Sequence, residues 1–180
     1  MSIYNTSSIS DTIVDCISDG GKVLVFGVGG NAANAVHFAA ELQGKFEKFE
    51  EPLPCIDLCS NVAVLTAITN DFGWENVFAR QIQALAQEGD IVLAFSISTK
   101  GPYLRRAFEE SLRSLAKVIL ICGRYTPIPI GSTKDVMYLE ESDNFVYFEL
   151  DSNDTPKVQE IQLQLTHQIC GEVKKRLSEN

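Results

Sequence analysis

Short apolar runs alternate with longer segments of mixed polarity along this chain. The apolar runs are rich in Val, Ile, Leu and Phe, which is typical of strands buried on both faces of a parallel sheet. They predict strands at residues 22–26, 54–58, 91–95 and 117–122, with two short edge strands at 136–139 and 145–150. The intervening segments predict helices at about 10–19, 32–45, 62–70, 74–87, 102–114 and 156–177.

The regular alternation of strands and helices predicts an α/β fold, a doubly wound parallel sheet in a three-layer sandwich. We expect one domain over residues 1–180, with the polar, Ser-rich residues 1–10 as a loose lead-in. Ligands of such folds bind at the carboxyl ends of the strands. Two turns lie at such ends, a glycine turn at 27–31 and a serine turn at 96–101.

Composition narrows the classes of partner. With 180 residues, 45% of them hydrophobic, the chain is long enough for one sizeable core. A formal net charge of -9 argues against binding to nucleic acid or anionic membranes, and no apolar run is long enough to span a bilayer. Five cysteines without a C-x-x-C pair indicate reduced thiols, so we expect a cytoplasmic protein.

The two turns differ in what they indicate. The glycine turn fails the dinucleotide fingerprint because Ala32 stands where its third glycine is required, which disfavours a Rossmann dehydrogenase. Its glycines either permit a tight turn or let a ligand approach the backbone. The serine turn, Ser96 to Gly101, is the better anion site, with three hydroxyl groups and Lys100 before a helix. Its alternative role is helix capping.

The only two histidines each have a potential partner on a predicted helix. His37 and Glu41 are spaced i, i+4 and share a helix face, so they could reach one ion. Gln159 and His167 are eight residues apart, a helical rise of about 12 Å, which is near the limit for two side chains meeting at one point. Spacing alone leaves a metal site and ordinary surface hydrogen bonds both open.

Four segments together resemble the phosphoheptose isomerase family of sugar isomerase (SIS) domains. They are G-V-G-G-N-A-A-N-A-V-H-F-A-A-E-L at 27–42, N-D-F-G at 70–73, the serine turn, and T-P-K-V-Q-E at 155–160. The resemblance follows the same order over about residues 20–175. The H-F-A-x-E-L and N-D-F-G elements are specific to the family, whereas the glycine turn is not.

The resemblance implies an aldose-ketose isomerase that converts sedoheptulose 7-phosphate to D-glycero-D-manno-heptose 7-phosphate through an enediol. It also implies a homotetramer with sites at subunit interfaces, one zinc ion per active site, and a phosphorylated sugar as substrate. The product would enter lipopolysaccharide, capsule or another heptose-containing glycan.

The resemblance also implies roles for particular residues. Glu41 would be the general base and His167 the partner acid or base. The metal ligands would be His37, Glu41, Gln159 and His167. The substrate-binding positions would be Gly29, Gly30, Asn31, Asn70, Asp71, Ser96, Ser98, Thr99 and Gln159.

The chain departs from the family pattern around this quartet. Val28 and Asn31 stand where the family usually has Asn and Ser, Lys45 replaces an Arg, and the serine turn loses at least one hydroxyl group in either alignment. These departures leave two alternatives open, a non-catalytic SIS regulator of the replication-initiator-associating type and a sugar-phosphate-sensing module. Retention of Glu41 and His167 argues against a pure scaffold, which has no chemical need for them.

Overall fold

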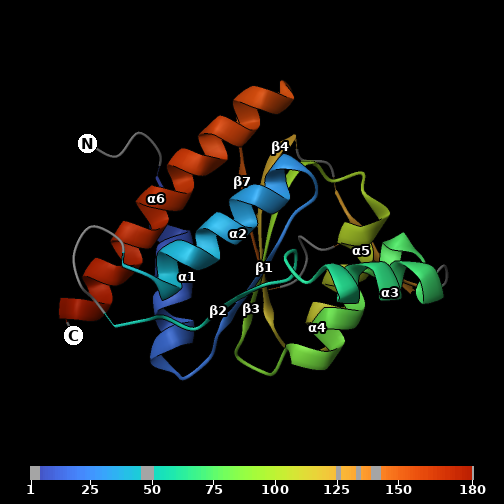
Figure 1. The fold of residues 1–180 in the computed structure, drawn as a ribbon, viewed down its shortest axis with the longest axis horizontal. Helices are drawn as coiled ribbons and strands as arrows, with labels where there is room; N and C mark the ends of the chain where they lie inside the picture. Colours follow the sequence, from blue (N-terminus) through green and yellow to red (C-terminus); the bar gives the residue numbers. More distant parts are fainter. Residues whose placement is uncertain (1–4, 46–50, 125–126, 133–134, 139–142, 180) are drawn as a thin grey trace.

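A five-stranded, all-parallel sheet forms the centre of the computed structural model, with helices on both faces (Figure 1). The structure describes residues 5–45, 51–124, 127–132, 135–138 and 143–179. The strands of the main sheet are β1 (Val23–Phe26), β2 (Cys55–Asp57), β3 (Ile91–Ser98), β4 (Lys117–Arg124) and β7 (Phe145–Glu149). The helices are α1 (Ser7–Ser18), α2 (Gly30–Gln43), α3 (Val62–Phe72), the 3-10 turn η1 (Trp74–Asn76), α4 (Ala79–Leu85), α5 (Pro102–Arg113) and α6 (Thr155–Glu179).

The strand order is β2-β1-β3-β4-β7, so the chain reverses its direction of travel through the sheet between β1 and β3. Ligands of doubly wound folds bind beside such a reversal, at the carboxyl ends of the strands. The glycine turn follows β1, and the serine turn begins at the end of β3. The topology therefore brings the two predicted ligand turns to adjacent strands at one edge of the sheet.

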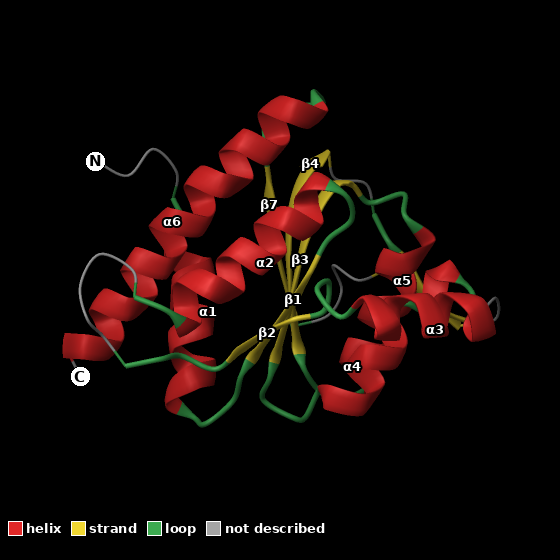
Figure 2. Cartoon of the chain, viewed as in Figure 1, coloured by secondary structure: helices red, strands yellow, loops and turns green. Residues whose placement is uncertain are grey.

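Two apolar layers sandwich the sheet, as expected for strands whose side chains are buried on both faces. In Figure 2 the red helices flank the yellow strands on two sides. One layer contains Ile13 of α1, Phe38 of α2 and Leu165 of α6, and the other contains Phe78 beside α4 and Phe108 of α5. Phe38 packs edge-on against Phe95 of the sheet, with ring centroids 6.0 Å apart. These contacts confirm the predicted sandwich.

One predicted helix is divided in the structure. The expected helix at 74–87 is instead the short turn η1 followed by α4. Val77 and Phe78, at the junction, are completely or almost completely buried, and the ring of Phe78 stacks on Phe26 with centroids 4.4 Å apart. Val77 and Phe78 keep helical backbone angles, φ -58° ψ -39° and φ -92° ψ -38°, so the chain continues in the same direction although the regular helix is interrupted there.

Three other expectations need correction. The segment predicted as an edge strand at 136–139 is β6 (Asp135–Tyr138), and it pairs antiparallel with β5 (Pro129–Ser132) in a separate hairpin. Residues 7–10 of the predicted lead-in are helical, because the hydroxyl groups of Thr6 and Ser10 donate to Glu172 of α6. Strand β3 continues through Ser98, so Ser96 and Ser98 are strand residues.

All five cysteines are free thiols, four of them buried and Cys59 partly buried, as the sequence predicted. Burial raises the pKa of Cys16 and of Cys59 to about 11 and that of Cys122 to about 12. These thiols stay protonated and weakly nucleophilic at neutral pH. In the described part of the chain, no helix combines the length and apolar character needed to cross a bilayer.

Candidate active site

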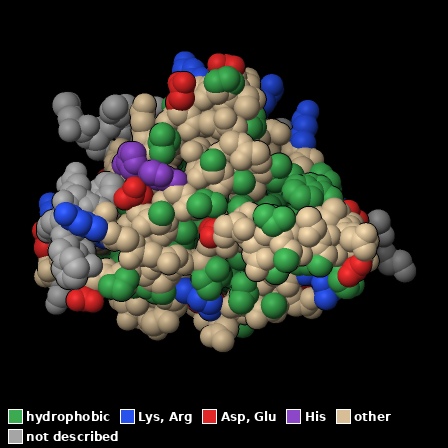
Figure 3. Space-filling model, in the orientation of Figure 1, with side chains coloured by type: hydrophobic (Ala, Val, Ile, Leu, Met, Phe, Trp, Pro, Cys, Tyr) green, Lys and Arg blue, Asp and Glu red, His purple; other side chains and the backbone are tan. Residues whose placement is uncertain are grey.

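Both histidines lie where helices α2 and α6 cross, 130 residues apart in sequence. The Nε2 atoms of His37 and His167 are 3.0 Å apart, and their rings meet edge-to-face with centroids 5.1 Å apart. The two side chains form a single purple patch on the surface in Figure 3. The fold therefore joins the two segments that sequence spacing alone could not connect.

Glu41 completes a group of three potential metal ligands. Its Oε1 atom is 3.1 Å from Nε2 of His37, so this nitrogen faces both the carboxylate and the second imidazole. One ligand atom from each of the three residues falls within 4.8 Å of the other two. A neutral imidazole nitrogen can donate or accept but cannot do both, so a cation between these atoms would satisfy lone pairs that hydrogen bonds cannot.

The donor set of this trio fits zinc. Two imidazoles and one carboxylate are the ligands found in catalytic zinc sites, where a fourth position stays open for water or substrate. The side chains of His37 and Glu41 are 40% and 20% exposed, so an ion and a substrate could reach them from solvent. The trio therefore could hold a catalytic metal ion.

An apolar seam aligns the two helices that carry the trio. On α2 the buried residues Ala35, Phe38, Ala39 and Leu42 repeat at helical spacing and share one core layer with Leu165 of α6. His37 and Glu41 lie on the adjacent stripe of α2, at the margin of this seam. One stripe of α2 therefore packs in the core, and the adjacent stripe carries the potential metal ligands His37 and Glu41.

Gln159 lies at the opposite end of α2 from Glu41, against the glycine turn. A Cβ atom added to Gly30 would stand 2.5 Å from the amide carbon, nitrogen and oxygen of Gln159. Gly30 is therefore the residue that lets this amide approach the first turn of α2. Gly29, the N-cap of α2, has φ +63°, a conformation that side chains rarely adopt.

A buried amide pair that the sequence analysis did not select links the same elements. Nδ2 of Asn34 donates to the backbone oxygen of Gln159 at 3.1 Å and to Oε1 of Gln162 at 3.3 Å. Nε2 of Gln162 in turn donates to the carbonyl oxygens of Ser96 and Ile121. The available signal was the position of these amides within otherwise apolar helix faces.

The first residues of the serine turn are largely buried and belong to strand β3. Ser96 is 2% exposed, and its hydroxyl group donates to the carbonyl oxygen of Ser98 at 2.7 Å. The N-cap of α5 is Gly101, which has no side chain with which to cap, so the helix does not take its N-cap from a hydroxyl group. Lys100 at the tip is exposed to solvent. The turn thus keeps a cation and a helix start beside the end of β3.

Asn70 and Asp71 do not join the histidine trio within one chain. They are exposed at the end of α3, where Nδ2 of Asn70 donates to the carboxylate of Asp71 at 2.7 Å. Helix α3 lies at one end of the molecule in Figure 1, and α6 lies at the other. Side chains on α3 could approach such a trio only if the trio belonged to a neighbouring copy of the chain.

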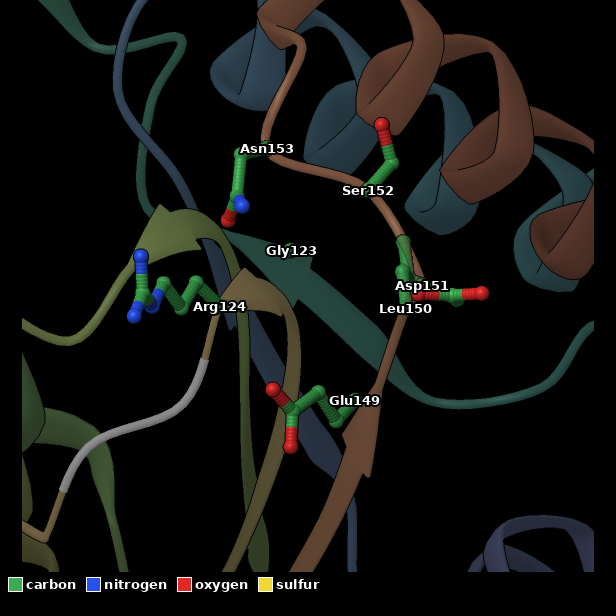
Figure 4. Close-up of a pocket in the computed structure, with 7 residues that line it drawn as sticks. All are labelled: Gly123, Arg124, Glu149, Leu150, Asp151, Ser152 and Asn153. Atoms are coloured by element: carbon green, nitrogen blue, oxygen red, sulfur yellow. The ribbon is translucent and has the colours of Figure 1, made fainter.

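A polar hollow of about 320 Å³ opens at the carboxyl ends of β4 and β7. Figure 4 shows Arg124 and Asn153 at its margin, with Glu149 below them and Asp151 directed away. Arg124 is paired in register with Ser98 of the serine turn. This hollow has more acidic than basic side chains, and sequence analysis did not select it.

Comparisons with known proteins show similarity over most of the chain. A family model described as "SIS domain" matches residues 5–123. A phosphoheptose isomerase of Geobacter sulfurreducens is 36% identical over 171 residues, covering 95% of this chain and 85% of the relative. One of Burkholderia pseudomallei is 40% identical over 164 residues, covering 91% and 77%.

Solved structures give the same match. A phosphoheptose isomerase from Francisella tularensis superposes with a TM-score of 0.83 at 30% identity, covering 94% of this chain and 84% of that one. One from Neisseria gonorrhoeae gives a TM-score of 0.80 at 28% identity, covering 94% and 85%. The similarity therefore includes nearly the whole chain, including the helices that carry both histidines.

Proposed function

Because the chain belongs to the phosphoheptose isomerase family of SIS-domain proteins, we propose that it is an aldose-ketose isomerase acting on a phosphorylated sugar. Its substrate would be sedoheptulose 7-phosphate and its product D-glycero-D-manno-heptose 7-phosphate. The observation that carries this proposal is the His37, Glu41 and His167 trio, whose ligand atoms lie within 4.8 Å of one another.

The reaction moves a proton between adjacent carbons through an enediol. It requires a base that removes the proton from carbon and a second group that donates a proton to the substrate oxygen or accepts one from it. Glu41 is the proposed base, since its carboxyl group is 20% exposed at the helix crossing and lies 3.1 Å from Nε2 of His37. His167 would deliver or accept the proton at the oxygen, because imidazole does both near neutral pH. Oε1 of Glu41 and Nε2 of His167 both lie beside Nε2 of His37, so the two groups could serve one substrate.

We propose that His37, Glu41 and His167 hold one zinc ion in each active site and that Gln159, whose amide lies against Gly30 in this structure, turns along α6 to become the fourth ligand. The bound ion would supply Lewis-acid stabilisation of the negative charge that develops on the enediolate oxygens. Three of these residues form the trio, and the donor types suit zinc. Gln159 is positioned by its contact with Gly30 and would add an amide oxygen. Its neutrality would leave the charge of the site unchanged.

The substrate phosphate would bind at the serine turn. Helix α5 has 12 residues, and its N-terminus carries partial positive charge that favours an anion. The proposed contacts are Ser98 and Thr99, with Lys100 adding a positive charge. The Ser96 hydroxyl group donates to Ser98, which supports a role for Ser96 in shaping the turn. Gly29, Gly30 and Asn31 would approach the sugar from the glycine turn.

The proposed assembly is a homotetramer with active sites at subunit interfaces. Among the residues of α3, all of which the structure describes, none is buried, although Val62 and Phe72 are apolar and 68% and 47% exposed. A hollow of about 540 Å³ between α3 and α4 continues this apolar surface. A second copy of the chain would cover it, and would bring Asn70 and Asp71 of one subunit toward the trio of another.

The proposed cellular setting is the cytoplasm, where five free thiols remain reduced. The product would serve the synthesis of a heptose-containing glycan such as lipopolysaccharide or capsule.

Incubation of the purified protein with sedoheptulose 7-phosphate and zinc, followed by NMR, tests the activity. We expect a heptose 7-phosphate aldose to appear, and Glu41→Gln to abolish its formation. A wild-type protein that binds the sugar phosphate in calorimetry without converting it would instead support a sensing module. Metal-free protein that recovers a replication initiator in a pull-down, again without turnover, would support the regulator.

A further inference from the structure

The amide pair of Asn34 and Gln162 is the point where both helices of the site meet the two central strands. Gln162 is 0% exposed, and its Nε2 donates to Ser96 at 2.9 Å on β3 and to Ile121 at 3.2 Å on β4. Its Oε1 accepts from Asn34 of α2, which is 8% exposed. Both N–H groups and the carbonyl oxygen of Gln162 are therefore satisfied inside the protein.

Each partner of this pair is close in sequence to a site residue. Asn34 precedes His37 by three residues, about one helical turn, and also holds the backbone oxygen of Gln159. Gln162 lies between Gln159 and His167 on α6. The carbonyl oxygen of Ser96 belongs to the residue at which the serine turn starts. The metal ligands and the phosphate turn thus share one hydrogen-bonded junction.

Directional bonds add to the register that the packed apolar seam between α2 and α6 provides. Hydrophobic contact itself is non-directional. A slip of α6 by one residue would move His167 about 1.5 Å along the helix axis. Catalytic and metal-binding groups must be held within about 0.5 Å of their working geometry. The bonds of Asn34 to Gln159 and Gln162 oppose such a slip.

We propose that Asn34 and Gln162 are positioning residues of the active site. Asn34 holds α2 in register with α6 and thereby sets the distance from His37 to His167. Gln162 holds the carbonyl oxygen of Ser96 and thereby sets the shape of the phosphate turn. The assignment of a sugar-phosphate substrate rests on the proposed function, whereas the metal and phosphate affinities can be measured without turnover.

The test uses Asn34→Leu and Gln162→Met, which remove the hydrogen bonds at similar side-chain size. The matched control is Gln81→Met. Gln81 is 8% exposed on α4, and its Nε2 likewise donates to two carbonyl oxygens, those of Leu58 and Val77, in the other core layer. Asn34→Ala and Gln162→Ala replace either variant that fails to fold.

We expect Asn34→Leu to weaken zinc binding about 10- to 100-fold, the range typical when an outer-shell partner of a metal ligand is lost. Competition with a chromophoric chelator measures this. We expect Gln162→Met to raise the Kd for inorganic phosphate, which 31P NMR measures. The KM for the sugar phosphate should rise by the same factor as this Kd. Gln81→Met should lower the Tm comparably and leave zinc and phosphate affinity unchanged.

The double variant tests whether the pair acts as one unit, because coupled residues show non-additive effects. The double variant Asn34→Leu/Gln162→Met should therefore lose no more zinc affinity than the single variant with the larger loss. The proposal is overturned if both single variants lose Tm as Gln81→Met does while keeping both affinities within about twofold of the wild type. A wild-type protein that binds zinc and phosphate without isomerising the sugar would overturn the proposed function and leave this test intact.

Discussion

The Nε2 atoms of His37 and His167 lie 3.0 Å apart, a hydrogen-bonding distance that only one proton can occupy. The pair must therefore contain one donor and one acceptor when no cation is present. A metal ion bound to both nitrogens would displace that proton from between them, because imidazole coordinates metals through an unprotonated nitrogen. The displaced proton would move to Nδ1 of the same ring, so metal binding should change the tautomer of one imidazole.

The first prediction concerns the two histidines as metal ligands. His167→Ala and His37→Ala should each weaken zinc binding by more than the roughly 10- to 100-fold typical of an outer-shell change, because each removes a direct ligand. Chelator competition measures the affinity. Arg113→Ala, a change at the exposed end of α5, serves as the control and should bind as the wild type does. Equal affinity in all four proteins would exclude a metal site at the trio.

The second prediction concerns proton transfer by Glu41. Glu41→Gln keeps the size of the side chain and removes its basicity, so kcat should fall about 10²- to 10⁴-fold, the usual contribution of a positioned base. Solvent deuterium incorporation at the carbon next to the carbonyl, followed by 1H NMR, should fall in parallel. Undiminished exchange in Glu41→Gln would assign the base to another residue.

The third prediction concerns the assembly of the site. Glu41→Gln and Asp71→Asn should each be inactive alone, because the proposed site takes Glu41 from one subunit and Asp71 from another. Unfolding the two together and refolding them as mixed oligomers should restore about a quarter of the wild-type sites, the statistical fraction for random pairing of subunits. Activity that stays at background in the mixture would place all site residues within one chain or exclude Asp71 from the site.

The fourth prediction separates two kinds of glycine. Gly30→Ala should displace Gln159, because the new Cβ would stand 2.5 Å from its amide, and should lower kcat and zinc affinity. Gly20→Ala is the control, since Gly20 has φ +86° with open space around it. It should destabilise the fold by about 1–2 kcal/mol through backbone strain and leave kcat unchanged below the Tm. If Gly30→Ala kept the kcat and zinc affinity of the wild type while Gly20→Ala lost kcat, Gln159 would not be a residue of the active site.

The fifth prediction concerns Glu172, which joins α1 to α6. Its partial burial acts to raise its pKa, but hydrogen bonds from Ser10, Thr6 and Gln168 and the charge of Arg176 outweigh burial and lower it below 4.5. A carboxyl group whose pKa is lowered by folding stabilises the protein above its unfolded pKa. That stabilisation is lost as the pH falls through the folded pKa. Acid should therefore loosen the attachment of α1.

Ser10→Ala tests this prediction. It removes a bond of 2.6 Å to the carboxylate and should lower the free energy of unfolding by about 1.5–3 kcal/mol at pH 7, as expected for a hydrogen bond to a charged group. The difference from the wild type should shrink below pH 4.5, where urea unfolding can be compared at several pH values. Thr12→Ala, on the exposed side of α1, is the control and should show no such pH dependence.

Local sequence patterns predicted the elements that carry the site but not how they meet. The i, i+4 spacing of His37 and Glu41 is a property of one helix, and the structure confirms their contact. The approach of His167 depends on the packing of α6 against α2, which no local spacing encodes. It could be expected only through the resemblance to a family. The junction of Asn34 and Gln162 was missed for the same reason, because its partners lie on four separate elements.

The errors along the chain also have a physical cause. The predicted helix at 74–87 is divided at Val77 and Phe78, whose side chains are buried in the sheet layer, a tertiary contact that the local pattern does not show. The strand β6 was correctly predicted as a strand, but its partner β5 lies in a Pro- and Gly-containing segment that resembles a loop. Pairing is non-local, so a single strand pattern does not name its neighbour.

The 130-residue separation between the two histidines has a consequence for how the protein folds. Contacts between distant parts of a chain form late, since they require closure of a long loop. Helix α2 can form early beside β1, but the trio exists only after α6, at the end of the chain, has docked on it. During refolding from urea, helical circular dichroism should return before the ability to bind zinc, and the interval between the two would time the docking of the last helix.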